Sequence, residues 1–180
     1  MPVMNDSGLG DANRILEPLP QTIVRDDFTP ALIAVIAAAH VFGSSRIYNE
    51  LFDLGANDWR LLSALSNEPG ATATQVCSRL GMNKSIASRS IATLLPRNLI
   101  TVDSSGPTKR LYLTREGAAM HDRILPIALE RERILESGLS LEEIQLLKKI
   151  LLRMLESFDD LQAFDNALVA GESITEATER

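Results

Sequence analysis

The clearest hydrophobic pattern lies in residues 72–95, where two short helical repeats stand back to back. Their apolar stripes are Ala73, Val76, Cys77 and Leu80 in the first repeat, and Ala87, Ile91, Leu94 and Leu95 in the second. Thr72 can cap the first helix, Gly81 can take the positive φ that ends it, and Asn83 can cap the next within two residues. So short a joint forces a steep crossing, and the pattern predicts a helix-turn-helix.

Two strand-like stretches follow this pair of helices. Residues 100–103 and 109–113 are rich in β-forming side chains and are joined by the turn sequence Ser-Ser-Gly-Pro. We expect an antiparallel pair, a wing, with Lys109 and Arg110 close to its tip, where a basic side chain can enter a minor groove.

Earlier in the chain, the pattern predicts two more helices. Thr29 and Pro30 make a good helix start, and that helix should run to about Phe52, stopping near Gly55. Its apolar residues surround most of its circumference, more than one domain face needs, so part of it should meet a second subunit. A second helix, capped by Asn57, should span residues 58–66.

After the wing, Thr114 should cap a long helix that Gly138 ends, with His121 on its polar side. Ser140 and Glu143 form a capping box for the last helix. A heptad-like seam runs along that last helix through Ile144, Leu147, Leu151, Met154, Phe158 and Leu161. The seam either packs on the preceding helix or, as we favour, joins the first helix in a two-fold dimer.

These patterns predict a mainly α-helical chain with a small β-wing. It divides into an N-terminal arm (1–28), a dimerisation helix (29–56), a winged helix-turn-helix DNA-binding lobe (57–117), C-terminal dimerisation helices (118–164) and a loose acidic tail (165–180). The arm is either disordered or part of the dimer interface.

Charge is distributed unevenly along the chain. The net charge of -6 argues against a nucleic-acid partner, yet residues 57–117 hold eight basic and four acidic residues, a charge of +4, and the remainder carries -10. The single cysteine excludes an intramolecular disulfide, and the first residues lack the basic start and apolar core of a signal peptide. We therefore expect a cytoplasmic protein. The longest apolar run, residues 31–42, contains His40 and is too short to span a bilayer.

The second helix of the pair offers a surface suited to double-stranded DNA. Its outward positions are small, hydroxylic or basic, so the helix can approach base edges and an arginine can pair with guanine; a plain solvated face is the alternative. The predicted DNA contacts are Thr72, Thr74, Lys84, Ser85, Ser88, Arg89, Lys109 and Arg110.

At this point the sequence resembles the MarR family of winged-helix transcription regulators. The resemblance rests on Trp59-Arg-Leu-Leu-Ser-Ala-Leu65, Asn83-Lys-Ser-Ile-Ala-Ser-Arg89, Leu99-Ile100 and Leu113-Thr114-Arg-Glu-Gly117, within residues 29–161. Asn98 stands where the family usually has glycine, although asparagine tolerates the left-handed conformation. The wing is about three residues shorter and lacks the family's Asp-x-Arg motif, which leaves open which wing residue enters the groove.

The resemblance also implies a ligand. The family binds small molecules, often aromatic acids, in a crevice between the DNA-binding lobe and the dimerisation helices, which makes His40, Arg46, Trp59 and Arg60 candidate contacts. Each of the four could instead have a purely structural role. The family's usual behaviour implies a repressor that a ligand releases from a near-palindromic operator.

Other functions find less support in the sequence. There is no metal-binding spacing, no phosphate-binding loop and no catalytic constellation, so we expect no enzyme, metal or cofactor. Cys77 lies in an apolar stripe, which favours packing over reactivity, but a redox-sensing regulator remains an alternative. A second alternative is a winged-helix module that binds an acidic protein and not DNA.

Overall fold

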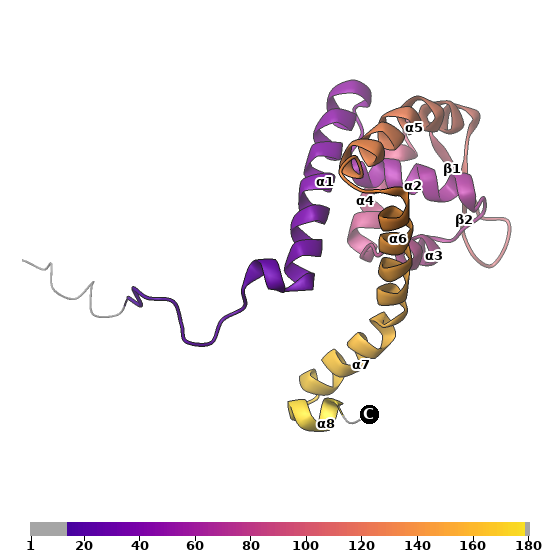
Figure 1. The fold of residues 1–180 in the computed structure, drawn as a ribbon. Coiled ribbons are helices and arrows are strands. Elements are labelled where there is room, and N and C mark those ends of the chain that lie inside the picture. The colour runs from indigo at the N-terminus through magenta and orange to yellow at the C-terminus, as the bar shows by residue number, and fades with distance from the viewer. Residues whose placement is uncertain (1–13, 179–180) are drawn as a thin grey trace, which may run out of the picture. The chain divides into compact units, whose positions relative to one another are not determined.

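The computed structural model describes residues 14–178, and these divide into two compact units with a boundary between His121 and Asp122. Unit 1 ends at His121 and unit 2 begins at Asp122. Helices make up most of both units, and the only sheet among the described residues is the two-stranded wing. A mainly α-helical fold with a small β-wing is confirmed (Figure 1).

Unit 1 begins with an exposed segment. Residues 14–24 have no regular structure, and a short 3-10 helix, η1 (Arg25–Asp27), precedes the first long helix. Much of the predicted arm, residues 1–13, lies outside the described residues. Its place in a dimer interface stays a prediction.

Helix α1 (Thr29–Phe52) has nearly the predicted length, but its first residue has a different role. Thr29 is already helical, Phe28 is the N-cap, and no side chain caps the helix. Asp53, at φ 55°, ends it in the left-handed conformation two residues before Gly55. Ser44 and Tyr48 are buried in unit 1, whereas Ile33 and Ile36 are exposed.

The apolar character of α1 extends beyond the run 31–42. That run is too short to span a bilayer, whereas the helix that contains it has 24 residues. By length and composition alone α1 could cross a membrane. Length and composition do not separate a membrane span from a helix that buries its apolar surface against protein.

The winged helix-turn-helix lobe is built around α2 (Ala56–Asn67), which is followed by α3 (Ala73–Leu80) and α4 (Lys84–Leu94). Leu61, Leu62 and Leu65 of α2 are almost fully buried and form the centre of the core, with Val76 of α3 and Leu94 of α4. The predicted cap at Asn57 is wrong. Gly55 is the N-cap, and its amide donates to the Asp58 carboxylate at 2.8 Å, so the helix starts earlier than its side-chain pattern indicated.

The wing pairs β1 (Ile100–Asp103) with β2 (Arg110–Leu113) in the antiparallel register Ile100 to Leu113 through Asp103 to Arg110. An isolated bridge between Ala71 and Leu111 fastens the wing to the turn before α3. Helix α5 (Arg115–Leu135) follows, and its Gly117 comes so close to the Leu99 carbonyl that a Cβ would overlap the oxygen. Close packing therefore requires glycine at position 117.

Unit 2 contains the rest of α5, then α6 (Leu141–Glu156), α7 (Phe158–Val169) and α8 (Ile174–Thr178). The Ser140–Glu143 capping box is present, with the Ser140 amide 2.7 Å from the Glu143 carboxylate. The seam was expected on one helix, but Ser157, with φ -84° and ψ 2°, breaks it into α6 and α7. The tail is not loose up to Thr178, since it includes the end of α7 and α8, and residues 179–180 lie outside the described residues.

Candidate nucleic-acid interface and effector hollow

The joint between α3 and α4 forms as the sequence predicted. The Gln75 amide donates to Thr72 Oγ1 at 3.2 Å, and the Thr72 amide donates to Gln75 Oε1 at 2.8 Å, which completes a capping box. Gly81 ends α3 at φ 58°, and the Ile86 amide donates to Asn83 Oδ1 at 2.9 Å. Thr72 Oγ1 therefore already accepts a hydrogen bond within the cap of α3, whereas the Thr74 side chain is exposed.

The outward side of α4 carries the predicted contact residues. Lys84, Ser85, Ser88 and Arg89 are all exposed, while Ala87 and Leu94 are buried. Arg89 Nε donates to the Ser85 carbonyl at 3.3 Å, so its side chain lies along its own helix. We call the exposed set Lys84, Ser85, Ser88 and Arg89 the recognition face.

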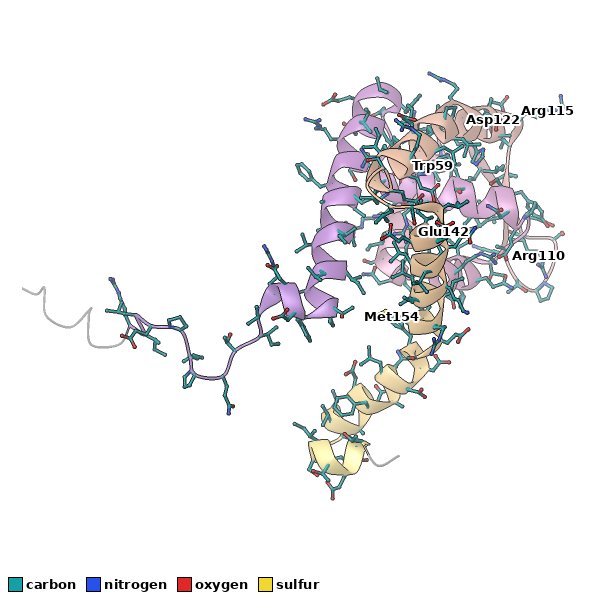
Figure 2. All side chains as sticks on the ribbon, in the orientation of Figure 1. Trp59, Arg110, Arg115, Asp122, Glu142 and Met154 are labelled. Atoms are coloured by element: carbon teal, nitrogen blue, oxygen red, sulfur yellow. The ribbon has the colours of Figure 1, made fainter. Side chains whose placement is uncertain are left out.

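The two predicted wing cations differ in their surroundings. Arg110 is exposed at the outer end of β2 (Figure 2), yet its Nη1 donates to the Gly70 carbonyl at 3.0 Å, which ties the wing to the α2–α3 turn. Lys109 precedes the strand and is exposed in the wing loop. The Ser105 hydroxyl and amide, together with Arg110, hold the pKa of the Asp103 carboxyl below its usual value. Arg110 is thus engaged with the protein itself.

A hollow of about 200 Å³ opens between α2 and α3. Its lining consists of Trp59, Arg60, Ser63, Ala64, Asn67, Arg79 and Leu80. Arg60 is the half-buried cation there: it donates to Asn57 Oδ1 at 3.2 Å and to the Leu80 carbonyl. Desolvation lowers the pKa of the Arg60 guanidinium, which nevertheless stays protonated. Arg79, beside it, pairs with Glu68.

The other two predicted ligand residues are not part of this hollow. His40 and Arg46 lie on the exposed side of α1, and neither lines the space beside Trp59 and Arg60. The structure therefore brings together two of the four candidates. Whether any of them binds a ligand stays a prediction.

His121 is a residue that the sequence reasoning misplaced on the polar side of its helix. It is half-buried and stacks on Trp59, with ring centroids 5.0 Å apart and planes at 26°. Tyr48 meets the same indole edge-on at 6.1 Å, and His121 Nε2 lies 3.4 Å from Ser66 Oγ. A signal existed, since His121 follows the close-packed Gly117 by four residues and so shares its face.

Within residues 14–178 no group of three His, Cys, Asp or Glu side chains could hold a metal ion. Cys77 is half-buried on α3.

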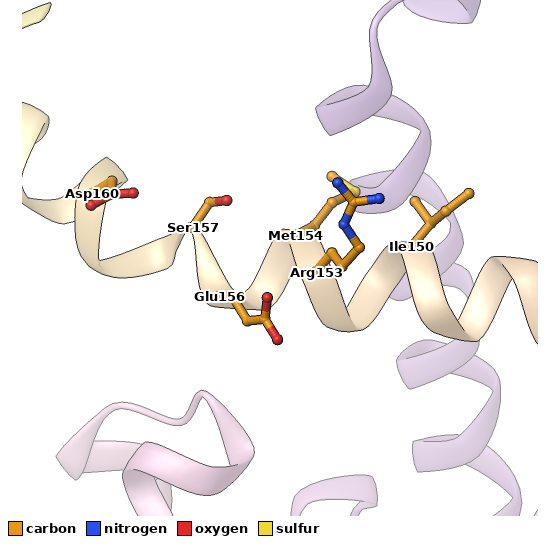
Figure 3. A pocket seen from close by; sticks show the side chains of 6 residues that line it. All are labelled: Ile150, Arg153, Met154, Glu156, Ser157 and Asp160. Carbon is orange, nitrogen blue, oxygen red and sulfur yellow. The ribbon is translucent and has the colours of Figure 1, made fainter.

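Unit 2 has a larger hollow at the junction of α6 and α7 (Figure 3). Its volume is about 580 Å³, and it is lined by Ile150, Arg153, Met154, Glu156, Ser157 and Asp160.

Comparisons with known proteins agree with this geometry. The model of the MarR family matches residues 52–111. A MarR/EmrR family transcriptional regulator from Acinetobacter sp. ADP1 is 26% identical, with a TM-score of 0.72, over 76% of this chain and 99% of its own. No curated protein sequence matches the chain.

Two further solved structures share the fold at lower identity. The S. aureus MepR–DNA complex has a TM-score of 0.65 at 24% identity, covering 75% of this chain and 99% of its own. PcaV from Streptomyces coelicolor, in complex with its natural ligand, has a TM-score of 0.64 at 20% identity, covering 76% and 98%.

Proposed function

We propose that the chain is a homodimeric repressor of the MarR family, which a small aromatic acid releases from a near-palindromic operator; the match of residues 52–111 to the model of that family and the likeness to a MarR/EmrR family regulator support this proposal. The observation that carries the DNA-binding part is the recognition face on α4. A helix with short hydroxylic side chains can enter the major groove deeply enough for Arg89 to pair with a guanine edge. Two such faces about 34 Å apart would contact half-sites one turn apart.

The fold also supports a location for the protein and for α1. A regulator that binds DNA acts in the cytoplasm, and there the apolar surface of α1 is best covered by another subunit. In the second half of α1, Ser44 and Tyr48 are already buried, whereas Phe42 and Leu51 stay exposed. Likeness to MepR, which was solved bound to DNA, supports the use of this lobe on a duplex.

The effector part of the proposal rests on the hollow beside Trp59. A planar acid could place its ring against the indole and its carboxylate near Arg60, and PcaV gives a precedent for a ligand in a protein of this fold. The acid would favour a spacing of the two recognition faces that no longer fits successive grooves. A switch from 1:99 to 99:1 requires about 5.5 kcal/mol of preference for one form.

The DNA-binding proposal is tested by affinity measurements on two duplexes. One is selected by the wild-type protein from a random-sequence library, and the other is its scrambled version. Arg89→Ala should weaken binding to the selected duplex and flatten the preference at one base position, whereas Lys84→Ala should weaken both duplexes alike. Lys149→Ala, on exposed α6, removes the same charge elsewhere and should change neither. Equal losses on both duplexes for both variants would contradict the assignment.

The same measurements distinguish the alternatives. If the wild-type protein binds no duplex even at low salt, the protein-interaction module replaces the DNA-binding proposal. Sulfenylation of Cys77 by mild peroxide, detected by mass spectrometry together with lost binding, would favour redox sensing over a ligand. The ligand itself is tested by titrating benzoate and related acids while recording Trp59 fluorescence and duplex release.

A further inference from the structure

An arginine just beyond the recognition helix reaches the end of α1. Arg97 lies in the turn that follows α4, and its Nη2 donates to the Phe52 carbonyl at 2.9 Å. Its Nη1 donates to the Asp53 carbonyl and lies 3.6 Å from the Asp53 carboxylate. One guanidinium therefore holds two successive carbonyls at the C-terminal end of α1.

The chemistry of this contact favours a fixed geometry. The last carbonyls of a helix lack partners within the helix and carry partial negative charge, which a cation stabilises. The planar guanidinium fork presents parallel donors, so two bonds define both a distance and a direction. The Asp53 side chain is 89% exposed, which means that solvent screens its ion pair and that the carbonyl bonds dominate.

The turn that carries Arg97 is itself firmly joined to α4. The Asn98 amide donates to the Leu95 carbonyl at 3.0 Å, and the Leu99 amide donates to the Leu94 carbonyl at 3.1 Å. Asn98 takes φ 54°, and Thr114 Oγ1 donates to its carbonyl at 2.5 Å. A displacement of the turn would thus move the C-terminal end of α4 with it.

We infer that Arg97 is a positioning residue that fixes the orientation of α4 relative to α1. Helix α1 carries the exposed apolar residues that we propose for the subunit interface. Because the Arg97 bonds join α4 to α1, the geometry of the dimer then determines the distance between the two recognition faces. The inference rests on the proposed function. It adds that specificity for two half-sites depends on a side chain that need not touch DNA.

The first test measures the ratio of affinities for the selected and scrambled duplexes. Arg97→Ala should lower this ratio at least about tenfold, because correct spacing matters for two half-sites but little for charge attraction to random sequence. Arg97→Lys keeps the charge and loses the planar fork of donors, so its affinity ratio should lie between those of the wild type and Arg97→Ala. Asp53→Asn keeps both carbonyl acceptors and tolerates the left-handed backbone, so its ratio should equal that of the wild type.

The second test needs no DNA. Nitroxide labels on Ser88→Cys, in a Cys77→Ser background, report the distance between the two recognition faces of the dimer by pulsed electron paramagnetic resonance. Arg97→Ala should broaden the distance distribution while sedimentation still shows a dimer and circular dichroism an unchanged helix content. Arg97→Lys provides the same comparison if the alanine variant does not fold.

The outcomes separate this inference from the proposed function. Wild-type protein that binds no duplex would remove the proposed function, whereas wild-type protein that binds specifically beside an Arg97→Ala variant with an unchanged ratio would remove only the role of Arg97. A distance distribution that is unaltered in Arg97→Ala would also remove the role of Arg97. A ratio that falls as far in Asp53→Asn would assign the effect to the ion pair and overturn the carbonyl contact.

Discussion

Several arginines of the winged helix-turn-helix lobe hold the main chain in place. Arg60 donates to the Leu80 carbonyl at the end of α3, Arg97 to Phe52 at the end of α1, and Arg110 to Gly70 before α3. Carbonyls at helix ends and in turns need donors, and a guanidinium reaches them over several ångströms. Arg97 and Arg110 therefore have a structural role, and Arg60 has one in addition to the effector contact proposed for it.

This use of arginine predicts different effects for the two neighbouring wing cations. Lys109→Ala should weaken binding to selected and scrambled duplexes equally, as expected for a phosphate contact. The slope of log affinity against log salt concentration should fall in magnitude by about one per lobe. Arg110→Ala should instead loosen the wing, because the Gly70 carbonyl loses its donor. Hydrogen exchange of the β1 and β2 amides measures the loosening. Faster exchange in Lys109→Ala and none in Arg110→Ala would reverse the assignment.

Helix starts and ends in this chain are predictable where the signal is local. Thr72, Gly81, Asn83 and Ser140 act over three or four residues, and all four end or begin helices where the sequence indicated. The α2 start was missed because a backbone N-cap, Gly55, takes its place. Local signals also identified the recognition face, since exposure on a short amphipathic helix follows from its period.

Longer-range features could not be predicted in the same way. His121 stacks on Trp59, a residue far away in the sequence. Its spacing of four residues from Gly117 indicates the buried side of α5, but no local pattern identifies Trp59 as its partner. The separation of His40 and Arg46 from the hollow depends likewise on how α1 packs. The apolar spacing of the seam continues past Ser157, although the helix ends there and a new helix begins. The hydrophobic pattern therefore did not indicate the bend.

The capping box of α3 predicts that Thr72 contributes to stability and Thr74 to DNA binding. Thr72→Ala should lower the free energy of unfolding by about 1 kcal/mol, because the Gln75 amide loses its acceptor. Thr72→Ser should keep most of that stability. Thr74→Ala, on the exposed side of the same helix, should stay within about 0.5 kcal/mol of wild type yet reduce duplex affinity. Urea unfolding and duplex binding measure the two effects, and a stable Thr72→Ala variant would refute the cap's importance.

The start of α5 predicts a steric limit. Gly117→Ala should destabilise the protein by about 1–3 kcal/mol, since the new Cβ overlaps the Leu99 carbonyl oxygen and the backbone must shift. The roughly 1 kcal/mol that alanine gains over glycine in a helix does not offset such an overlap. Gly106→Ala, with open space around it, is the matched control and should be nearly neutral in urea unfolding. Equal effects at both positions would contradict the close packing.

At the scale of the whole molecule, much apolar surface is left uncovered. In the described part of unit 2 the buried apolar residues are Ile124, Ala167 and Ala177, while Leu152, Leu155 and Phe158 are about 60% exposed. Helix α1 is similarly exposed at Val35 and Ile36. A chain with so small a core in unit 2 requires another surface to cover these helices, and a second copy of itself can cover both.

A charge placed on α1 should separate the subunits. Ile36→Glu puts a carboxylate into the proposed interface, so we predict a monomer at micromolar concentration by sedimentation equilibrium, with weakened binding to the selected duplex. Asn49→Glu adds the same charge at an exposed position near the other end of α1 and should remain dimeric. A dimeric Ile36→Glu variant would place the interface elsewhere.

The arginine contacts also limit the salt dependence of DNA binding. Of the eight basic residues in 57–117, Arg60, Arg97 and Arg110 donate to carbonyls and Arg79 pairs with Glu68. We therefore expect Lys84, Lys109 and Arg115 to neutralise phosphates, together with Arg89 on a scrambled duplex that offers it no matching guanine. Four such cations on each of two lobes predict a slope of log affinity against log salt near about -7, whereas all eight would give about -14. Fluorescence anisotropy on the scrambled duplex across a salt series measures this slope. A value close to the larger figure would mean that the arginines release their carbonyls on binding DNA, and that the lobe rearranges when it meets the duplex.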